Sequence, residues 1–366
     1  MYKKRIDISD LYENKIIIYG AGFCGLAFSD MLLNIKITPQ VFFDTNITKQ
    51  VKNYNNINVS LPYICHDKNT IVIICLLNTS FYSEIEEKLL SLGYERIVNI
   101  YELTEIEELF LNQPLIFYVN RNWKEINMGN ISKIISFLSD KKSVDTYKGI
   151  IDFICKDYNV NIDSYPMVEQ YFAYDVYKKS DAEVFVDCGA FRGDILKIFL
   201  KNNENKYKRY IAIEPDPDNY NRIYQLQEAQ NKDVRIIEEA LSDKEELLKM
   251  KNFMNENSVI CDCGFEVHAC TLDSICLKYD IEPTFIKIDV EGYEEKLLNG
   301  AYETISMYKP IIAMAIYHKC DDLWKLPLKI KSILPNHRLY IRSYMNVNET
   351  VLYAVPEERV CDEIRK

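Results

Sequence analysis

The feature that most constrains the fold is an apolar run that ends in an acid and leads through a glycine loop into an amphipathic helix. Residues 184–187 read Val-Phe-Val-Asp, Gly189 and Gly193 lie in the loop, and a helical run follows at 193–201. A strand that ends beside a helix N-terminus is how parallel α/β sheets bind ligands at their carboxyl edge. The chain is therefore predicted to contain a doubly wound α/β domain.

A second predicted strand indicates a nucleoside ligand at this edge. Residues 209–213 are followed by Glu214, Pro215 and Asp216. A carboxylate at the end of the second strand accepts both ribose hydroxyls of an adenosine-type cofactor. The first glycine lies two residues after Asp187 and the next four later, which differs from the dinucleotide fingerprint. This tight loop suits a phosphate-free ligand such as S-adenosylmethionine.

The remaining pattern of this domain alternates strands with helices. Further strands are predicted at 234–238, 284–289, 310–317, 338–342 and 350–355, and helices at 217–229, 293–299 and 322–333. Only residues 343–349 join the last two strands. Parallel strands need a crossover of a dozen or more residues, so this pair is expected to be antiparallel. A mostly parallel sheet that ends in an antiparallel hairpin is the class I methyltransferase variant of the doubly wound fold.

The N-terminal part shows a second strand–helix series, with strands predicted at 15–19, 41–43, 70–76 and 97–100 and a helix near 81–92. Gly20, Gly22 and Gly25 follow the first strand, and Asp44 follows the second. This is the context of a dinucleotide fingerprint, so these residues form a candidate site for a nucleotide or a nucleotide-sugar headgroup. The alternative is that the glycines serve only helix–strand packing.

Two Rossmann-like domains with a helical segment between them are therefore predicted. A small Rossmann-like domain spans 1–102, a helical bridge spans 103–181, and the methyltransferase-like domain spans 182–366. Helical periodicity at 131–138 and 147–154 supports the bridge. The bridge is too apolar to stay solvated, so we expect it to pack on the C-terminal domain.

Residues 183–356 resemble the FkbM family of S-adenosylmethionine-dependent methyltransferases. The match lies in segments 183–193, 213–216, 240–243, 271–273 and 285–292, with 170–172, 317–319, Arg342 and 349–353 also similar. The resemblance implies methyl transfer, usually to a hydroxyl of a sugar or a natural product. It implies that the cofactor's amino-acid tail is held by Asp187 and the loop of Gly189, Ala190, Phe191 and Gly193. Glu214, with Pro215 and Asp216, would bind the ribose, and Asp243 the adenine amino group. Helix capping and turn formation are the competing roles for Asp187 and Glu214.

Three residues are candidates for the chemistry. Asp289 and Glu291 follow the strand at 284–289, and His318 ends the strand at 310–317. An alcohol must lose its proton as the methyl group arrives, and an imidazole at this edge suits a general base. Asp289 also lies where it can touch the cofactor. We assign no metal ligands, although hard carboxylate oxygens at Asp289 and Glu291 are an alternative Mg²⁺ site. The spacing of Cys261, Asp262, Cys263, His268 and Cys270 is not that of a known zinc finger or ribbon, and residues 266–272 alternate like an edge strand.

Composition limits the partners. The net charge is −11 and the pI about 5.1, which disfavours nucleic acid and leaves a small-molecule or carbohydrate acceptor. The start lacks the apolar run of a signal peptide, no segment reaches the roughly 20 apolar residues of a membrane helix, and the eleven cysteines are scattered. We expect a cytoplasmic protein with reduced thiols; the sequence does not indicate its oligomeric state.

Two other functions compete with methyl transfer. A nicotinamide-dependent oxidoreductase would use the N-terminal glycines, but the chain lacks a recognisable Tyr-x-x-x-Lys pair after a suitable strand. A non-catalytic S-adenosylmethionine-binding protein would differ from an enzyme only in forming no product.

Overall fold

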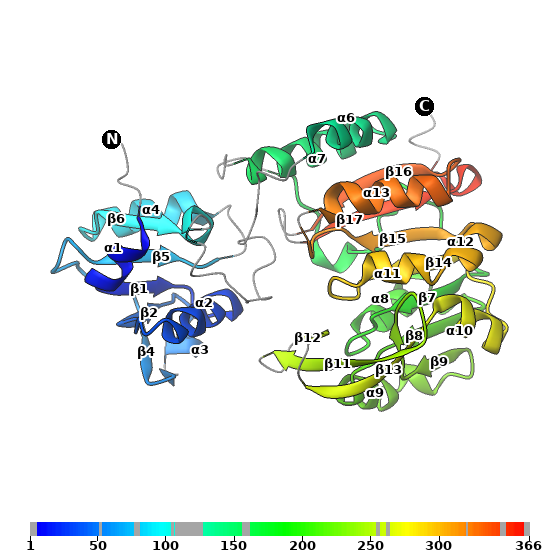
Figure 1. The fold of residues 1–366 in the computed structure, drawn as a ribbon, viewed down its shortest axis with the longest axis horizontal. Coiled ribbons are helices and arrows are strands. Elements are labelled where there is room, and N and C mark those ends of the chain that lie inside the picture. The colour runs from blue at the N-terminus through cyan, green and yellow to red at the C-terminus, as the bar shows by residue number, and fades with distance from the viewer. Residues whose placement is uncertain are drawn as a thin grey trace. The chain divides into compact units, whose positions relative to one another are not determined.

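The computed structural model describes residues 6–50, 53–76, 81–103, 106, 127–155, 162–253, 257–260, 264–319, 321–344 and 349–361. The chain divides into two compact units. Unit 1 comprises 1–125, 149–162 and 345–348, and unit 2 comprises 126–148, 163–344 and 349–366. The border falls inside helix α7 (Lys141–Ile154). Each unit has its own sheet (Figure 1), and no helix of the described residues is long and apolar enough to cross a membrane.

Unit 1 is built on a six-stranded sheet in the order β3-β4-β2-β1-β5-β6. Strands β4, β2, β1, β5 and β6 pair in parallel, and β3 pairs antiparallel with β4. The strands are β1 (Ile16–Tyr19), β2 (Val41–Phe43), β3 (Asn53–Tyr54), β4 (Ile57–Ser60), β5 (Ile71–Ile74) and β6 (Arg96–Asn99). The helices are α1 (Ile8–Glu13), α2 (Phe23–Asn34), α3 (Ile47–Gln50) and α4 (Tyr82–Ser91). The predicted Rossmann-like fold is confirmed, and the short β3–β4 hairpin adds to it.

Unit 2 is built on a seven-stranded sheet in the order β16-β17-β15-β14-β7-β8-β9. Strand β17 is antiparallel to both neighbours, and the other pairs are parallel. The strands are β7 (Val184–Cys188), β8 (Arg209–Ile213), β9 (Val234–Ile237), β14 (Phe285–Ile288), β15 (Ile311–Ala315), β16 (Arg338–Ser343) and β17 (Thr350–Val355). The predicted methyltransferase form of the doubly wound fold, with its antiparallel last hairpin, is confirmed.

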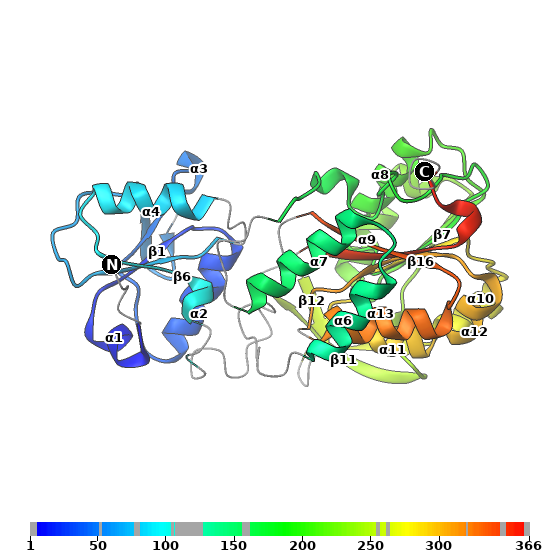
Figure 2. The same ribbon diagram turned by 90° about the horizontal axis from the view of Figure 1, so that it is seen from above.

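Helices cover both faces of the unit 2 sheet. Figure 2 shows α8 (Asp194–Asn202) on one face and α11 (Glu294–Asn299), α12 (Tyr302–Tyr308) and α13 (Asp322–Ile333) on the other. Helices α9 (Pro217–Tyr224) and α10 (Leu272–Tyr279) complete the crossovers. The predicted bridge contributes α6 (Met128–Phe137), which packs against α13. Its residues 104, 105, 107–126 and 156–161 lie outside the described residues.

A second sheet in unit 2 was not predicted. It has the order β10-β13-β11-β12, with β10 (Ala240–Leu241), β11 (Glu246–Phe253), β12 (Asn257–Ile260) and β13 (Phe265–Cys270). Strand β13 pairs with β10 on one side and β11 on the other, so the edge-strand interpretation is wrong. Apolar and polar residues alternate along β13 because one face of this sheet is buried and the other is exposed. The alternation therefore does not indicate whether a strand has one or two neighbouring strands. Residues 261–263, which belong to the cysteine- and histidine-containing segment considered for zinc, lie outside the described residues.

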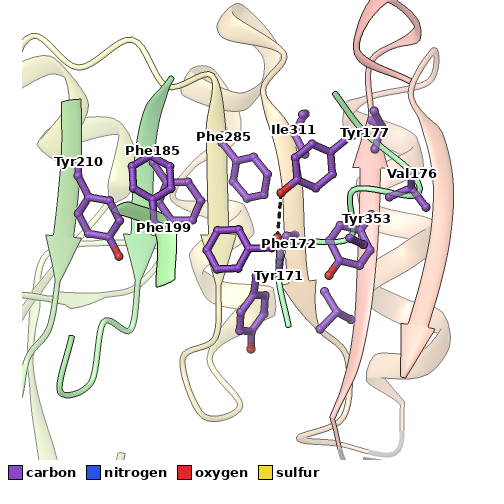
Figure 3. Close-up of a cluster of buried hydrophobic side chains, with 14 of the residues drawn as sticks. Tyr171, Phe172, Val176, Tyr177, Phe185, Phe199, Tyr210, Phe285, Ile311 and Tyr353 are labelled. Atoms are coloured by element: carbon purple, nitrogen blue, oxygen red, sulfur yellow. Dashed lines mark hydrogen bonds between the residues drawn. The ribbon is translucent and has the colours of Figure 1, made fainter. Parts of the chain in front are cut away.

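An aromatic cluster on one face of the unit 2 sheet positions the segment before β7. Phe185 stacks on Tyr210 at 5.2 Å and on Phe285 at 4.7 Å between ring centroids, and all three lie on neighbouring strands (Figure 3). Phe172 stacks on Phe185 at 6.1 Å, and the Tyr177 hydroxyl donates to the Tyr171 carbonyl at 3.3 Å. Such ring pairs add to the stability from burial. They fix the adjoining Tyr171 against the sheet.

Candidate functional site

A cavity of about 370 Å³ opens at the carboxyl edge of the unit 2 sheet. Its wall includes residues that follow β7, β8 and β14, and also residues from the segment before β7 and from β10. The predicted site residues on the wall are Gly189, Ala190, Phe191, Glu214, Pro215, Asp289 and Glu291. Asp187, Gly193, Asp216, Asp243 and His318 are not on it.

The loop after β7 is tightly fitted to the strand ends beside it. Gly189 has φ +81°, and a Cβ there would lie 1.8 Å from the Asp289 carbonyl oxygen. The N–H groups of Gly189 and Ala190 donate to the Ile213 carbonyl at 3.0 and 3.1 Å. Gly193 also has φ +81° and is the N-cap residue immediately before α8. A side chain at position 189 would therefore push apart the loops that form the cavity.

Glu214 faces this cavity from the end of β8. Its Oε2 accepts from the Phe191 N–H at 2.8 Å and its Oε1 from the Asp216 N–H at 3.0 Å. Burial raises the pKa of the Glu214 carboxyl to about 7. Asp216 instead caps α9, because its Oδ1 accepts from the N–H groups of Asp218 and Asn219 at 2.8 and 3.0 Å. Glu214 therefore faces the cavity, whereas Asp216 caps the N-terminus of α9.

Asp187 lies beneath the cavity. It is fully buried, its Oδ2 accepts from the Tyr210 hydroxyl at 2.5 Å, and its Oδ1 lies 3.0 Å from Lys287 Nζ. Lys287 Nζ also donates to the Gly189 carbonyl at 2.6 Å. Burial lowers the pKa of Lys287, but the negative charges of Asp187 and Asp289 outweigh this and raise it. The charged Lys287 therefore links Asp187 to the glycine loop.

Lys287 was not among the predicted site residues. Its position in the apolar strand Phe-Ile-Lys-Ile was an available signal, because a lysine is almost never fully buried without a partner. The sequence did not indicate that the partner is Asp187, on the neighbouring strand.

Asp289, Glu291 and His318 come together at the ends of β14 and β15, as predicted from their positions. His318 Nε2 lies 3.4 Å from Asp289 Oδ1 and 3.5 Å from Glu291 Oε2. His318 Nδ1 lies 2.8 Å from Oε1 of the buried Glu294. Burial lowers the pKa of His318, but Glu294, Glu291 and Asp289 together raise it well above its usual value. The imidazole is thus surrounded by carboxyl groups and lies behind the cavity wall.

Gln170 and Tyr171, in the segment that precedes β7, form hydrogen bonds to two carboxylates at this end of the cavity. The Tyr171 hydroxyl donates to Asp289 Oδ2 at 2.7 Å, and Gln170 Nε2 donates to Glu349 Oε2 at 2.7 Å. Gln170, Tyr171 and Glu349 all line the cavity. Tyr171 has φ +66°, which is uncommon for a bulky residue. Gln170 and Tyr171 resemble the family in sequence, but their role in orienting these acids was not predicted.

The acid that follows the third strand differs from the expectation. Asp243 is exposed and does not line it, whereas Glu239, Ala240 and Leu241 do. Glu239 Oε2 lies 2.6 Å from His268 Nδ1 on β13. Strand β10 ends at Leu241, and Asp243 lies beyond the cavity, so Glu239 rather than Asp243 is the acid on this part of the wall.

The predicted N-terminal site can be described separately in unit 1. A cavity of about 270 Å³ is lined by residues that include Gly20 and Asp44. Asp44 Oδ2 accepts from the Ala21 N–H at 2.9 Å and Oδ1 from the Asn46 N–H at 2.7 Å. A Cβ on Gly25 would lie 1.8 Å from the Gly20 carbonyl, so close packing of α2 requires Gly25. Gly22 is the N-cap residue before α2 and, like Gly25, does not line the cavity.

The fold and the cavity define the class of protein. A seven-stranded sheet with an antiparallel last strand pair and a cavity at the ends of β7, β8 and β14 is the class I methyltransferase architecture. Residues 187–342 match the family model of the methyltransferase FkbM domain. The matched residues lie within unit 2, so this part of the chain is an FkbM methyltransferase domain, as the resemblance predicted.

Comparison with solved structures agrees with this fold. The methyltransferase FkbM from Methylobacillus flagellatus is 21% identical, with 93% of this chain and 90% of that chain covered and a TM-score of 0.74. This match shows the same fold. A SAM-dependent methyltransferase from Leishmania major is 10% identical over 69% of this chain and 91% of that chain, with a TM-score of 0.25 that supports no comparison. No curated protein matches the chain.

Proposed function

We propose that this methyltransferase uses S-adenosylmethionine to methylate a hydroxyl of a sugar or a glycan precursor. The observation that supports it is one cavity with Glu214 on its wall and the cluster of Asp289, Glu291 and Glu349 on the same wall. Glu214 suits the ribose of the cofactor, and the cluster suits a polar acceptor.

The residues of the cavity fit the cofactor. Gly189 lets its loop pack directly against the Asp289 carbonyl, which holds the loop on the cavity wall beside Glu214. Each oxygen of Glu214 accepts one backbone hydrogen bond, and a carboxylate oxygen has capacity for a second. Glu239 lies where it can accept the adenine amino group. Asp187 and Lys287 act from below by holding the Gly189 carbonyl.

The part of the site that binds the acceptor must remove the proton of the acceptor hydroxyl. S-adenosylmethionine supplies a methyl group on a sulfonium, and its transfer to a hydroxyl releases S-adenosylhomocysteine and one proton. Asp289 and Glu291 line the cavity while His318 lies behind them, so we assign the contact with the acceptor hydroxyl to these carboxylates. His318, held by Glu294, is assigned to orient them. Positioning of this kind supplies much of the catalysis in a displacement reaction.

The test is product formation with purified protein. We expect S-adenosylhomocysteine to form with a carbohydrate acceptor, and His318→Ala to reduce turnover while cofactor binding persists. Cofactor binding without product from a broad panel of sugars would favour the non-catalytic binding protein, and binding of NAD alone would favour the oxidoreductase.

A nucleotide site in unit 1 remains a hypothesis with one favourable observation. Asp44 bonds the N–H of Ala21 in the loop after β1, just as Glu214 bonds the N–H of Phe191 in the loop after β7. The packing of Gly20 and Gly25 explains those two glycines without a ligand. Titration with NAD and nucleotide-sugars separates the two interpretations.

A further inference from the structure

The cluster at the ends of β14 and β15 has the composition and spacing of a metal centre. One carboxylate oxygen from Asp289, one from Glu291 and one ring nitrogen of His318 all lie within 4.8 Å of one another. Two carboxylates and one imidazole are donors that divalent cations accept. The two carboxylates lie on the cavity wall, so a cation among them would be accessible to a substrate.

The residues around these three groups orient them toward one point. Glu294 Oε1 lies 2.8 Å from His318 Nδ1, so the other ring nitrogen is directed at Asp289 and Glu291. The hydroxyl of Tyr171 donates to Asp289 Oδ2, which turns Oδ1 toward His318. Histidines that bind metals usually donate their second ring N–H to a carboxylate in this way.

One oxygen of this group, Asp289 Oδ1, faces the His318 imidazole at 3.4 Å without forming a hydrogen bond. Asp289 Oδ1 is buried and makes no hydrogen bond with any residue in the described part of the chain. A buried carboxylate oxygen without a partner is costly, and its cost is removed by a cation. The surrounding charge agrees, because the carboxyl groups of Asp289, Glu291, Glu294 and Glu349 outnumber the nearby cationic groups of His318 and Lys287.

We propose that Asp289, Glu291 and His318 bind one divalent cation, which in turn binds the hydroxyl to be methylated and a neighbouring oxygen of a vicinal diol. Three protein ligands leave coordination positions open, as in catalytic metal sites. A hydroxyl bound to a cation loses its proton more readily. The oxygen then forms a bond to the methyl carbon as the carbon–sulfur bond breaks, and the proton passes to the Glu349 carboxylate. The role in catalysis rests on the proposed function, whereas cation binding itself does not.

Cation binding can be measured without turnover. The full-length protein is treated with a chelator, dialysed and titrated with Mn²⁺, and free Mn²⁺ is followed by its paramagnetic resonance signal. We expect one site per chain, competition by Mg²⁺, and at least roughly tenfold weaker binding in Asp289→Asn and in Glu291→Gln. Glu295→Gln is the matched control, because Glu295 lies beside Glu294 on the same helix and is not among the three proposed ligands.

The outcomes separate this proposal from the proposed function. Calorimetric titration with S-adenosylmethionine shows whether each variant keeps a folded cofactor site. If wild-type protein does not bind added Mn²⁺, or if both variants bind it as tightly as Glu295→Gln does, the cation site is refuted even when methyl transfer occurs. Specific Mn²⁺ binding in a protein that binds no S-adenosylmethionine would refute the proposed function and leave the cation site standing.

Discussion

The buried pair of Asp187 and Lys287 gives the sharpest prediction on stability. The two side chains are 0% and 3% exposed, and Lys287 is the cation within 3.0 Å of Asp187 Oδ1. Replacing Lys287 with Met fills similar space but leaves Asp187 without its charge partner. Removing one member of such a pair costs about 3–5 kcal/mol, whereas a pair replaced as a whole costs far less. We therefore expect Lys287→Met to lose about 3–5 kcal/mol of unfolding free energy in unit 2, and Asp187→Asn combined with Lys287→Met to recover most of it.

The loss should depend on pH. In wild-type protein burial raises the pKa of Asp187, and Lys287 acts against this rise. Without Lys287 the folded-state pKa of Asp187 is higher still, while in the unfolded chain it stays near about 3.9. When the pKa of an acid is higher in the folded than in the unfolded state, the free energy of unfolding falls as the pH rises above the unfolded-state pKa. Lys287→Met should therefore be closest to wild type near about pH 4 and fall by up to about 1.4 kcal/mol per pH unit above it.

The assay is urea unfolding followed by tryptophan fluorescence. The chain has two tryptophans, and Trp123→Phe leaves Trp324, which is buried in α13 of unit 2, as the reporter. Lys296→Met is the matched control, because Lys296 is half-exposed and lies 3.9 Å from Glu246. The control should cost less than about 1 kcal/mol. A loss in Lys287→Met as small as that of the control, or one that does not vary with pH, would refute the reasoning.

Three further predictions concern ligands and turnover. Because burial raises the pKa of Glu214 to about 7 and the ribose needs the carboxylate, S-adenosylmethionine affinity should rise about tenfold from about pH 6 to 8, and calorimetry on Glu214→Gln should show no such rise. Tyr171→Phe removes the hydrogen bond to Asp289 and should lower kcat about tenfold without changing cofactor affinity. Equal kcat values for Tyr171→Phe and wild-type protein would contradict this prediction. If unit 1 binds a nucleotide, calorimetric titration with NAD or nucleotide-sugars should give heat that Asp44→Ala abolishes; heat unaffected by Asp44→Ala would place the ligand elsewhere.

Much of the fold follows from the sequence because the parallel strands are fully buried. Runs such as Val184–Cys188 and Ile311–Ala315 are buried throughout and lead into polar residues at one edge. The order of these runs along the chain is enough to place Glu214, Asp289 and His318 at that edge. The antiparallel last pair followed in the same way, from the short connection between β16 and β17.

The parts that the sequence did not indicate depend on contacts between distant segments. Whether Asp216 meets a ligand or caps α9 depends on how the chain turns after β8. Glu239 rather than Asp243 lies on the cavity wall because of where β10 ends. Strand β10 belongs to the second sheet, and the alternation of apolar and polar residues does not specify how the strands of that sheet pair. The place of His318 behind two carboxylates depends on Glu294, which is 24 residues away in the chain.

The central claim is that the unit 2 cavity binds S-adenosylmethionine through Glu214. Calorimetric titration of the purified protein with S-adenosylmethionine, S-adenosylhomocysteine and NAD tests it most directly. The structure predicts binding of both adenosyl ligands in the micromolar range, lost in Glu214→Ala and kept in Asp243→Ala, because Asp243 does not line the cavity. Binding of NAD without either adenosyl ligand, or adenosyl binding that survives Glu214→Ala unchanged, would contradict the account.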